Sequence, residues 1–148
     1  MMIARRVALV VSLLGASAFL SDARAQSSPL GAALLQFEEA VTWDAVGAEW
    51  RGIRPGWLQQ VAAAKSPGEI AALMAALETT MGWHAVEQSW RARRDSWTAE
   101  AQRARTDAAV ARLLLELEEA TLWSAVEQSW REARPRWVAQ VQRIAGGR

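Results

Sequence analysis

Apolar residues recur along this chain with helical spacing, in stripes that change direction abruptly. The first stripe consists of Leu30, Leu34, Phe37 and Val41, spaced by four, three and four residues. A second stripe starts at Trp43, directly after it. On one continuous helix the two stripes would lie on nearly opposite faces, because successive residues rotate by about 100°. We therefore expect the helix to break near Thr42.

The same pattern returns twice, each time 40 residues later and with no insertion. The repeat is clearest in the tryptophans, three in each copy and seven residues apart. The nine tryptophans are Trp43, Trp50, Trp57, Trp83, Trp90, Trp97, Trp123, Trp130 and Trp137. The copies span about residues 28–65, 66–105 and 106–146. Repeated units of this length bury their apolar faces against one another, and three are the usual minimum for stability.

Capping residues divide each copy into helices. Ser28, Ser66 and Thr106 stand where an N-cap is expected, and Ser66 is followed by Glu69 at capping-box spacing. Pro55 interrupts the second stripe, as Pro135 does in the third copy, so a kink or a new helix start is expected there. The sequence predicts an all-α fold of three tandem 40-residue helical-hairpin repeats, forming a short solenoid or a compact bundle.

Residues 1–25 have the features of a secretory signal peptide. Arg5 and Arg6 precede an apolar run, and Ala23-Arg24-Ala25 is an A-x-A cleavage site. The run is shorter than the ~20 residues that a membrane-spanning helix needs. The chain has no cysteine, which excludes disulfides and a lipid-anchored cysteine. We expect residues 26–148 to form one domain, located in the periplasm or secreted.

Removing this segment changes the charge balance. Of the 17 basic and 16 acidic residues in the chain, Arg5, Arg6, Arg24 and Asp22 belong to the leader, which leaves 14 and 15. A domain without excess positive charge has no electrostatic basis for binding nucleic acid.

Indole rings can form a hydrophobic core or a binding surface. Nine indoles that bury ~200 Å² each would contribute on the order of 45 kcal/mol at ~25 cal/mol per Å². The other large apolar residues are mostly single leucines and valines among alanines, so we expect most indoles to be structural. The predicted structural set is Trp43, Trp50, Trp83, Trp90, Trp123 and Trp130. A minority is expected to be exposed, on the terminal copies or beside the proline kink. The candidates to bind a partner or ligand are Trp57, Trp97 and Trp137.

An arginine and a glutamate also recur in every copy. The arginines are Arg54, Arg94 and Arg134, and the glutamates are Glu38, Glu78 and Glu118. Four residues after Trp50 and three before Trp57, the Arg54 guanidinium could lie between two indoles. Two interpretations remain open. The glutamate and arginine form an ion pair that fixes the hairpin register, or three arginines on one face bind an anionic or planar ligand.

Little in the sequence indicates catalysis. His84 is the only histidine, and its equivalents Asp44 and Ser124 suggest an exposed polar position. No metal or cofactor site is predicted, and no carboxylate pair stands outside the repeat. The favoured function is a non-catalytic binding or scaffolding module for an unknown protein, glycan or lipid partner. A membrane-surface envelope protein is the first alternative, and a glycan-acting enzyme with paired carboxylates is the second.

Overall fold

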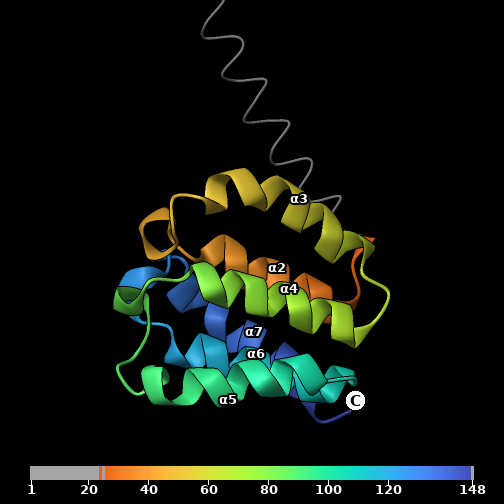
Figure 1. Cartoon of the computed structure of the whole chain (residues 1–148). Helices are drawn as coiled ribbons and strands as arrows, with labels where there is room; N and C mark the ends of the chain where they lie inside the picture. Colours follow the sequence, from red (N-terminus) through yellow and green to blue (C-terminus); the bar gives the residue numbers. More distant parts are fainter. Residues whose placement is uncertain (1–23, 25, 148) are drawn as a thin grey trace, which may run out of the picture.

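The computed structural model describes residue 24 and residues 26–147, and these residues form a compact, all-helical fold without strands (Figure 1). The predicted signal peptide lies outside the described residues except for Arg24. The α-helices are α2 (Pro29–Ala40), α3 (Trp50–Ala63), α4 (Pro67–Thr80), α5 (Trp90–Arg103), α6 (Asp107–Ala120) and α7 (Trp130–Ala145). Short 3₁₀ turns precede α3, α5 and α7, at Trp43–Ala45, Trp83–Ala85 and Trp123–Ala125.

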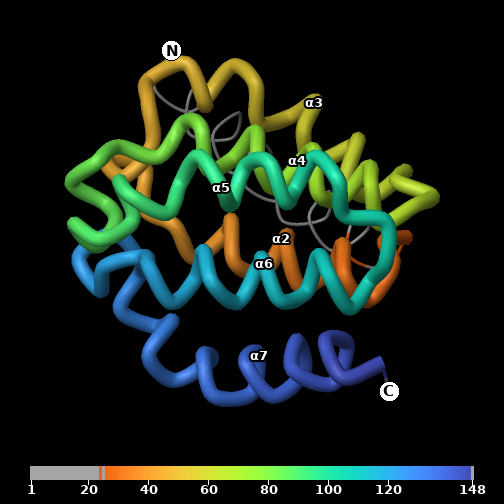
Figure 2. Tube along the Cα trace, turned by 60° about the horizontal axis from the view of Figure 1, so that its bottom comes forward, coloured from red at the N-terminus to blue at the C-terminus, as the bar shows by residue number. Residues whose placement is uncertain are grey.

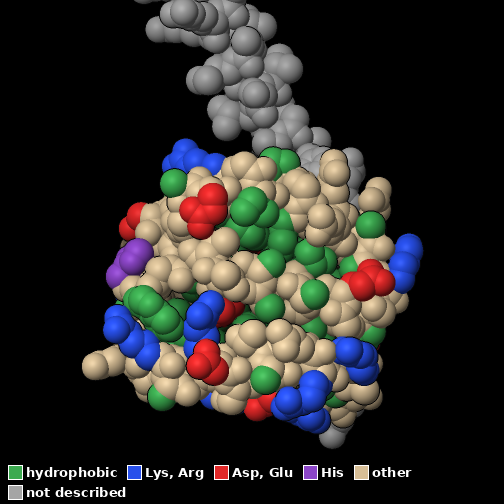
Figure 3. All heavy atoms as spheres, viewed as in Figure 1, with side chains coloured by type: hydrophobic (Ala, Val, Ile, Leu, Met, Phe, Trp, Pro, Cys, Tyr) green, Lys and Arg blue, Asp and Glu red, His purple; other side chains and the backbone are tan. Residues whose placement is uncertain are grey.

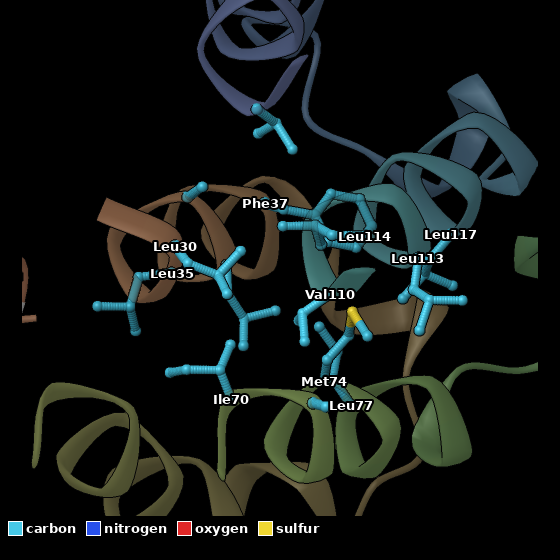
Figure 4. Packing of buried hydrophobic residues seen from close by; sticks show 14 of the residues in the cluster. Leu30, Leu35, Phe37, Ile70, Met74, Leu77, Val110, Leu113, Leu114 and Leu117 are labelled. Carbon is cyan, nitrogen blue, oxygen red and sulfur yellow. The ribbon is translucent and has the colours of Figure 1, made fainter. Parts of the chain in front are cut away.

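Helices α2, α4 and α6 form the centre of the molecule, and each contacts the other two. Their leucines, Phe37 and Met74 fill the space between them (Figure 4). The remaining helices lie outside. Helix α3 contacts α2 and α4, α5 contacts α4 and α6, and α7 contacts α6 and α2, so that the last helix returns to the first (Figure 2). The packing is therefore closed.

The helix starts form as expected. The hydroxyl of Ser28 accepts a hydrogen bond from the Gly31 amide at 3.1 Å. Those of Ser66 and Thr106 accept from the third residue after them, at 3.3 and 3.1 Å. Each of these side chains satisfies an amide that the first helical turn leaves without a partner.

The predicted break near Thr42 is confirmed, since α2 ends at Ala40 and Val41 is extended. The tryptophan stripe is not one helix, however. Trp43 lies in the 3₁₀ turn and α3 begins only at Trp50, with Pro55 inside it rather than at its start. Backbone hydrogen bonds to other parts of the chain hold the segment between the two.

The three 3₁₀ turns meet at one end of the molecule, on the left in Figure 1, where Ala45, Ala85 and Ala125 pack together. Backbone hydrogen bonds connect each turn to another. The amide of Thr42 donates to the Ala125 carbonyl at 2.9 Å, and the same bond joins Gly82 to Ala45 and Leu122 to Ala85, both at 2.9 Å. A second set runs from Gly47 to Thr80, Glu87 to Ala120 and Glu127 to Ala40, at 2.8, 2.7 and 2.7 Å. We call this end the turn pole.

Candidate functional site

The nine tryptophans occupy three kinds of position and fall into two classes according to their burial. Those at the start of α3, α5 and α7 are buried, and so are those seven residues further along each helix. The tryptophans of the 3₁₀ turns are half exposed: Trp43 at 48%, Trp83 at 45% and Trp123 at 49%. All three lie at the turn pole. Figure 3 shows a hydrophobic patch at this end of the molecule, bordered by basic side chains.

The exposure expected of Trp57, Trp97 and Trp137 is therefore wrong, because these rings are buried. Each reaches across to the next inner helix. The Trp57 indole N–H donates to the Leu73 carbonyl on α4 at 2.8 Å, and Trp97 donates to Leu113 on α6 at 3.0 Å. Trp137 donates to the Ala33 carbonyl on α2 at 2.9 Å, which connects the last helix to the first. These rings join α3, α5 and α7 to an inner helix and are not available to a ligand.

The tryptophan at the start of each outer helix is also a core residue. Trp50 packs edge to face against Trp57, with ring centroids 5.3 Å apart. Its indole N–H donates to the carboxylate of Glu38 at 3.2 Å. The same contacts are made by Trp90 with Glu78 and by Trp130 with Glu118. The ring thus provides packing area and one donor to a buried carboxylate.

Each of these carboxylates is paired with the recurrent arginine. Glu38, Glu78 and Glu118 lie in the last turn of α2, α4 and α6 and are buried. Arg54 donates to Glu38 from Nε at 2.6 Å and from Nη2 at 3.0 Å. Arg94 pairs with Glu78 at 2.8 Å, and Arg134 pairs with Glu118 at 2.5 Å. The hydrogen bond from Arg134 to Glu118 raises the pKa of that guanidinium further above its usual value.

The arginines stack on the exposed indoles and not between the buried ones. The guanidinium of Arg54 lies 5.7 Å from the Trp43 ring centroid, and that of Arg51 lies 4.8 Å from it. The other two copies have the same arrangement, with Arg91 and Arg94 over Trp83 and Arg131 and Arg134 over Trp123. Both guanidinium groups are within the ~6 Å range of a cation–π contact. They hold the exposed ring in one position.

We call each of these clusters a niche. The first niche consists of Glu38, Trp43, Trp50, Arg51 and Arg54. The second consists of Glu78, Trp83, Trp90, Arg91 and Arg94. The third consists of Glu118, Trp123, Trp130, Arg131 and Arg134. A hollow of about 210 Å³ opens at the first niche and one of about 270 Å³ at the third.

His84 and Asp44 are polar residues of two turns that lie side by side. A ring nitrogen of His84 lies 2.8 Å from the backbone carbonyl of Asp44, not from its carboxylate. The Thr42 side chain hydrogen-bonds the Asp44 carboxylate and is the main reason that its pKa is lowered. In the part of the chain that the structure describes, no cluster of His, Cys, Asp or Glu could hold a metal ion. Across the same residues, no helix meets the length and hydropathy that crossing a bilayer requires.

Comparison with known proteins gives one match. Residues 26–82 match a family model described as a domain of unknown function (DUF8799). The match covers α2, α3, α4 and the chain up to Gly82, and so includes Glu38, Trp43 and Arg54 of the first niche. No curated protein matches the chain, and no solved structure does.

The exposed class of tryptophans is the feature that sequence reasoning missed. Trp43, Trp83 and Trp123 belong to the predicted structural set but are half exposed. The prediction follows from the helical stripe, which Trp43 fits together with Trp50 and Trp57. The signal was present, because a tryptophan directly after a predicted helix break lies in the connection rather than on the helix. Connections run over the surface.

Proposed function

We propose that this protein is an exported, non-catalytic binding or scaffolding module that engages a protein partner through the turn pole. In this proposal, three copies of one helical hairpin close into a ring and present three equivalent niches. The observation that carries it is the half exposure of Trp43, Trp83 and Trp123 at one end of the molecule. Exposed tryptophans are uncommon on a free surface and are enriched at the centres of protein interfaces.

The fixed position of these rings supports the proposal. Each 3₁₀ turn is held by backbone hydrogen bonds to another turn, and each ring is covered by two guanidinium groups. A partner that binds such a ring loses little conformational entropy, because the ring is already ordered.

The arginines divide into two roles in this proposal. Arg54, Arg94 and Arg134 neutralise buried glutamates, and we assign them first to the fold. Arg51, Arg91 and Arg131 are exposed, and no carboxylate partner is found for them among the described residues. We assign these three to the binding surface together with the exposed indoles.

Export is supported by the leader-like sequence of residues 1–25. The family match begins at Gln26, the residue that follows the predicted cleavage site. We place the mature protein in the periplasm or outside the cell.

The test compares the full-length chain with its W43A/W83A/W123A variant, both immobilised and exposed to envelope extract of the source cell. We expect the wild type to retain a defined protein at stoichiometric amount and the variant to lose it. I53A removes an exposed hydrophobic residue outside the niches and is the matched control. Circular dichroism checks that the variants fold. Equal retention by the wild type and the triple variant would refute the proposal.

A membrane surface is the second candidate, because tryptophan and arginine together at one end of a protein suit the headgroup region of a bilayer. Vesicles of phosphatidylethanolamine and phosphatidylglycerol test it by co-sedimentation. Sedimentation of the wild type but not of W43A/W83A/W123A would favour this candidate over a protein partner. A glycan-acting enzyme is a weaker candidate, since the buried glutamate of each niche is engaged by arginine and tryptophan.

A further inference from the structure

Another hollow lies between α7 and α2, outside the niches. Its volume is about 360 Å³, larger than that of the hollows at the first and third niches. Five polar side chains line it, and none of them belongs to a niche: Gln36, Ser129, Glu132, Arg136 and Gln140. We call it the closing-seam hollow, because it lies where the last helix packs against the first.

The fold holds both walls of this hollow in place. Gln36 comes from α2, whereas the other four polar side chains come from α7 and the residue before it. Those four are spaced by three, four and four residues, which places them on one face of the helix. The buried ring of Trp137 also lines the hollow, and its bond to Ala33 fixes α7 against α2.

The equivalent place between α5 and α6 is filled by the protein itself. There Arg93 donates to Glu116 from Nε and from Nη2, both at 2.8 Å. It also donates to the Ser96 hydroxyl at 2.8 Å. In the third copy Ala133 stands at the place of Arg93. The closing seam therefore lacks the long side chain that occupies the seam before it.

The fold leaves polar groups of the closing-seam hollow without partners. Among the described residues, Glu132 and Arg136 form no ion pair, although their i,i+4 spacing is suited to one. The Oε1 atom of Gln36 is shielded from solvent and has no hydrogen-bond partner. A shielded amide oxygen without a donor is unfavourable. The last torsion of a glutamine is broad, so this oxygen can turn toward a donor in the hollow.

The chemistry of the lining selects a neutral ligand with several hydroxyl groups. Gln36, Ser129 and Gln140 have side chains that both donate and accept hydrogen bonds, as a hydroxyl group does. Glu132 adds an acceptor and Arg136 adds donors, and their charges cancel. An apolar molecule would leave these groups without partners. The volume is at the lower end of the range for small-molecule sites, which favours a small ligand.

We propose that the closing-seam hollow binds one unit of a neutral saccharide. The sugar hydroxyls accept from Arg136 and donate to Glu132 and to the Gln36 oxygen, so that the ligand bridges α7 and α2. The saccharide is a free sugar or the terminal unit of a glycan. This inference goes beyond the proposed function, because the site contains no residue of the niches.

The test is an NMR titration of the full-length, ¹⁵N-labelled chain with glucose, galactose, mannose and N-acetylglucosamine in turn. The side-chain amide signals of Gln36 and Gln140 and the indole signal of Trp137 report on the hollow. Saturable shifts of these signals are expected with at least one sugar. No shift is expected at the equivalent indole of Trp97.

Two further ligands refine the titration. Cyclohexanol, a six-membered ring with one hydroxyl group, is the control and should bind at least tenfold more weakly than the sugar. The linear tetrasaccharide of the sugar that binds distinguishes the two sources. Tighter binding of the tetrasaccharide indicates a glycan, and equal or weaker binding indicates a free sugar.

Two variants, each with a matched control, decide whether the hollow is the site. Q36M removes the amide at similar side-chain length and is expected to weaken binding at least tenfold, whereas Q60M makes the same exchange on α3 and should not. A133R adds the side chain that Arg93 provides between α5 and α6, and is expected to abolish binding. I53R adds it at the equivalent position of the first copy and should leave the affinity unchanged. Circular dichroism checks that the variants fold.

The absence of a saturable shift with all four sugars would overturn the inference. So would equal binding of cyclohexanol, or unchanged affinity in Q36M and A133R. An equal loss in I53R would also contradict it, because the added charge alone would then explain the effect.

The W43A/W83A/W123A variant separates this inference from the proposed function. It should bind the sugar as the wild type does, even where it loses its protein partner. Loss of the sugar in this variant, with its fold intact, would place the saccharide at the turn pole and overturn the inference.

Discussion

Trp83 and Trp97 carry the same side chain on neighbouring parts of the chain but have opposite surroundings. Trp97 is fully buried and donates to the Leu113 carbonyl, whereas Trp83 lies at the surface under Arg91 and Arg94. A buried indole that is truncated leaves a cavity and, here, an acceptor without its donor.

We therefore expect Trp97→Ala to lower the free energy of unfolding by about 3–5 kcal/mol. Trp83→Ala should cost about 1 kcal/mol or less, because the ring keeps much of its surface in water. Urea denaturation followed by circular dichroism measures both. Equal losses in the two variants would contradict the assignment of Trp83 to the binding surface.

The two arginines over Trp83 form a second matched pair. Arg94→Ala removes the partner of the buried Glu78 and should cost about 2–3 kcal/mol, less than a fully buried pair because Arg94 is partly exposed. Arg91→Ala removes only a stacking contact, so a loss below about 1 kcal/mol is expected. Thermal and urea unfolding measure the stability of the two variants. The interpretation of Arg94 as a register-fixing residue fails if both changes cost the same.

Arg93 makes acid stability sensitive to one exposed carboxylate. Its guanidinium donates to Glu100 at 2.8 and 3.1 Å, and this contact holds the pKa of Glu100 below its usual 4.5. A lowered pKa stabilises the fold above the unfolded value and loses that effect as the pH falls through the folded value. In Arg93→Gln, the pKa of Glu100 should return toward 4.5, and less stability should be lost between about pH 5 and pH 3.

A carboxyl ¹³C NMR titration of Glu100 measures this shift directly. Arg136→Gln removes a positive charge from another exposed site and is the control. An unchanged Glu100 pKa in the Arg93 variant would show that the ion pair is not formed in solution.

Residue spacing reveals some of these roles and not others. The recurrent Glu38 and Arg54 were predicted as a possible pair, and they form one. The proximity of Glu127 to the end of α2 could not be predicted, because these residues are far apart in sequence and meet only through the backbone bond from the Glu127 amide to the Ala40 carbonyl.

At the scale of the helices, capping residues act where their side chains reach the first turn. Ser66 caps α4 by accepting from the Glu69 amide. Ser89 precedes α5 at the equivalent position, but its side chain makes no such bond.

We expect Ser66→Ala to lower stability by about 1 kcal/mol, while Ser66→Asn retains most of it. Ser89→Ala should change stability by less than about 0.5 kcal/mol. Differential scanning calorimetry measures the three variants. A loss in Ser89→Ala as large as that in Ser66→Ala would argue against the Ser66 cap.

Helix starts could be predicted from sequence because they depend on local contacts, but the 3₁₀ turns could not. The amide of Thr42 and the carbonyl of Ala45 find their partners in Ala125 and Gly82. With such partners, the chain between Trp43 and Trp50 need not satisfy its backbone groups within a helix. The stripe alone therefore favoured a longer helix than the one that forms.

For the whole molecule, the sequence left a solenoid and a compact bundle equally open. The contacts within one 40-residue segment are the same in both. The bond from Trp137 to Ala33 distinguishes them, because it joins the last helix to the first.

Closure predicts that the chain tolerates a new order of its segments. In a circular permutant, residues 66–148 are followed directly by residues 26–65. The six residues between α7 and α2 then replace the short connection that links α3 to α4. We expect the permutant to remain monomeric and to unfold within several degrees of the parent chain, as gel filtration and thermal denaturation would show. A permutant whose new ends lie at Arg91, inside α5, is the control and is expected not to fold.

The hydrogen bonds of the turn pole also determine how its amides exchange with solvent. Thr42, Gly82 and Leu122 lie outside the α-helices, where amide protons ordinarily exchange within a brief local fluctuation. Their acceptors belong to turns about 40 or more residues away along the chain. Breaking any one of these three hydrogen bonds requires two turns to separate. Deuterium should therefore exchange into the Thr42, Gly82 and Leu122 amides as slowly as into the amides of the inner helices.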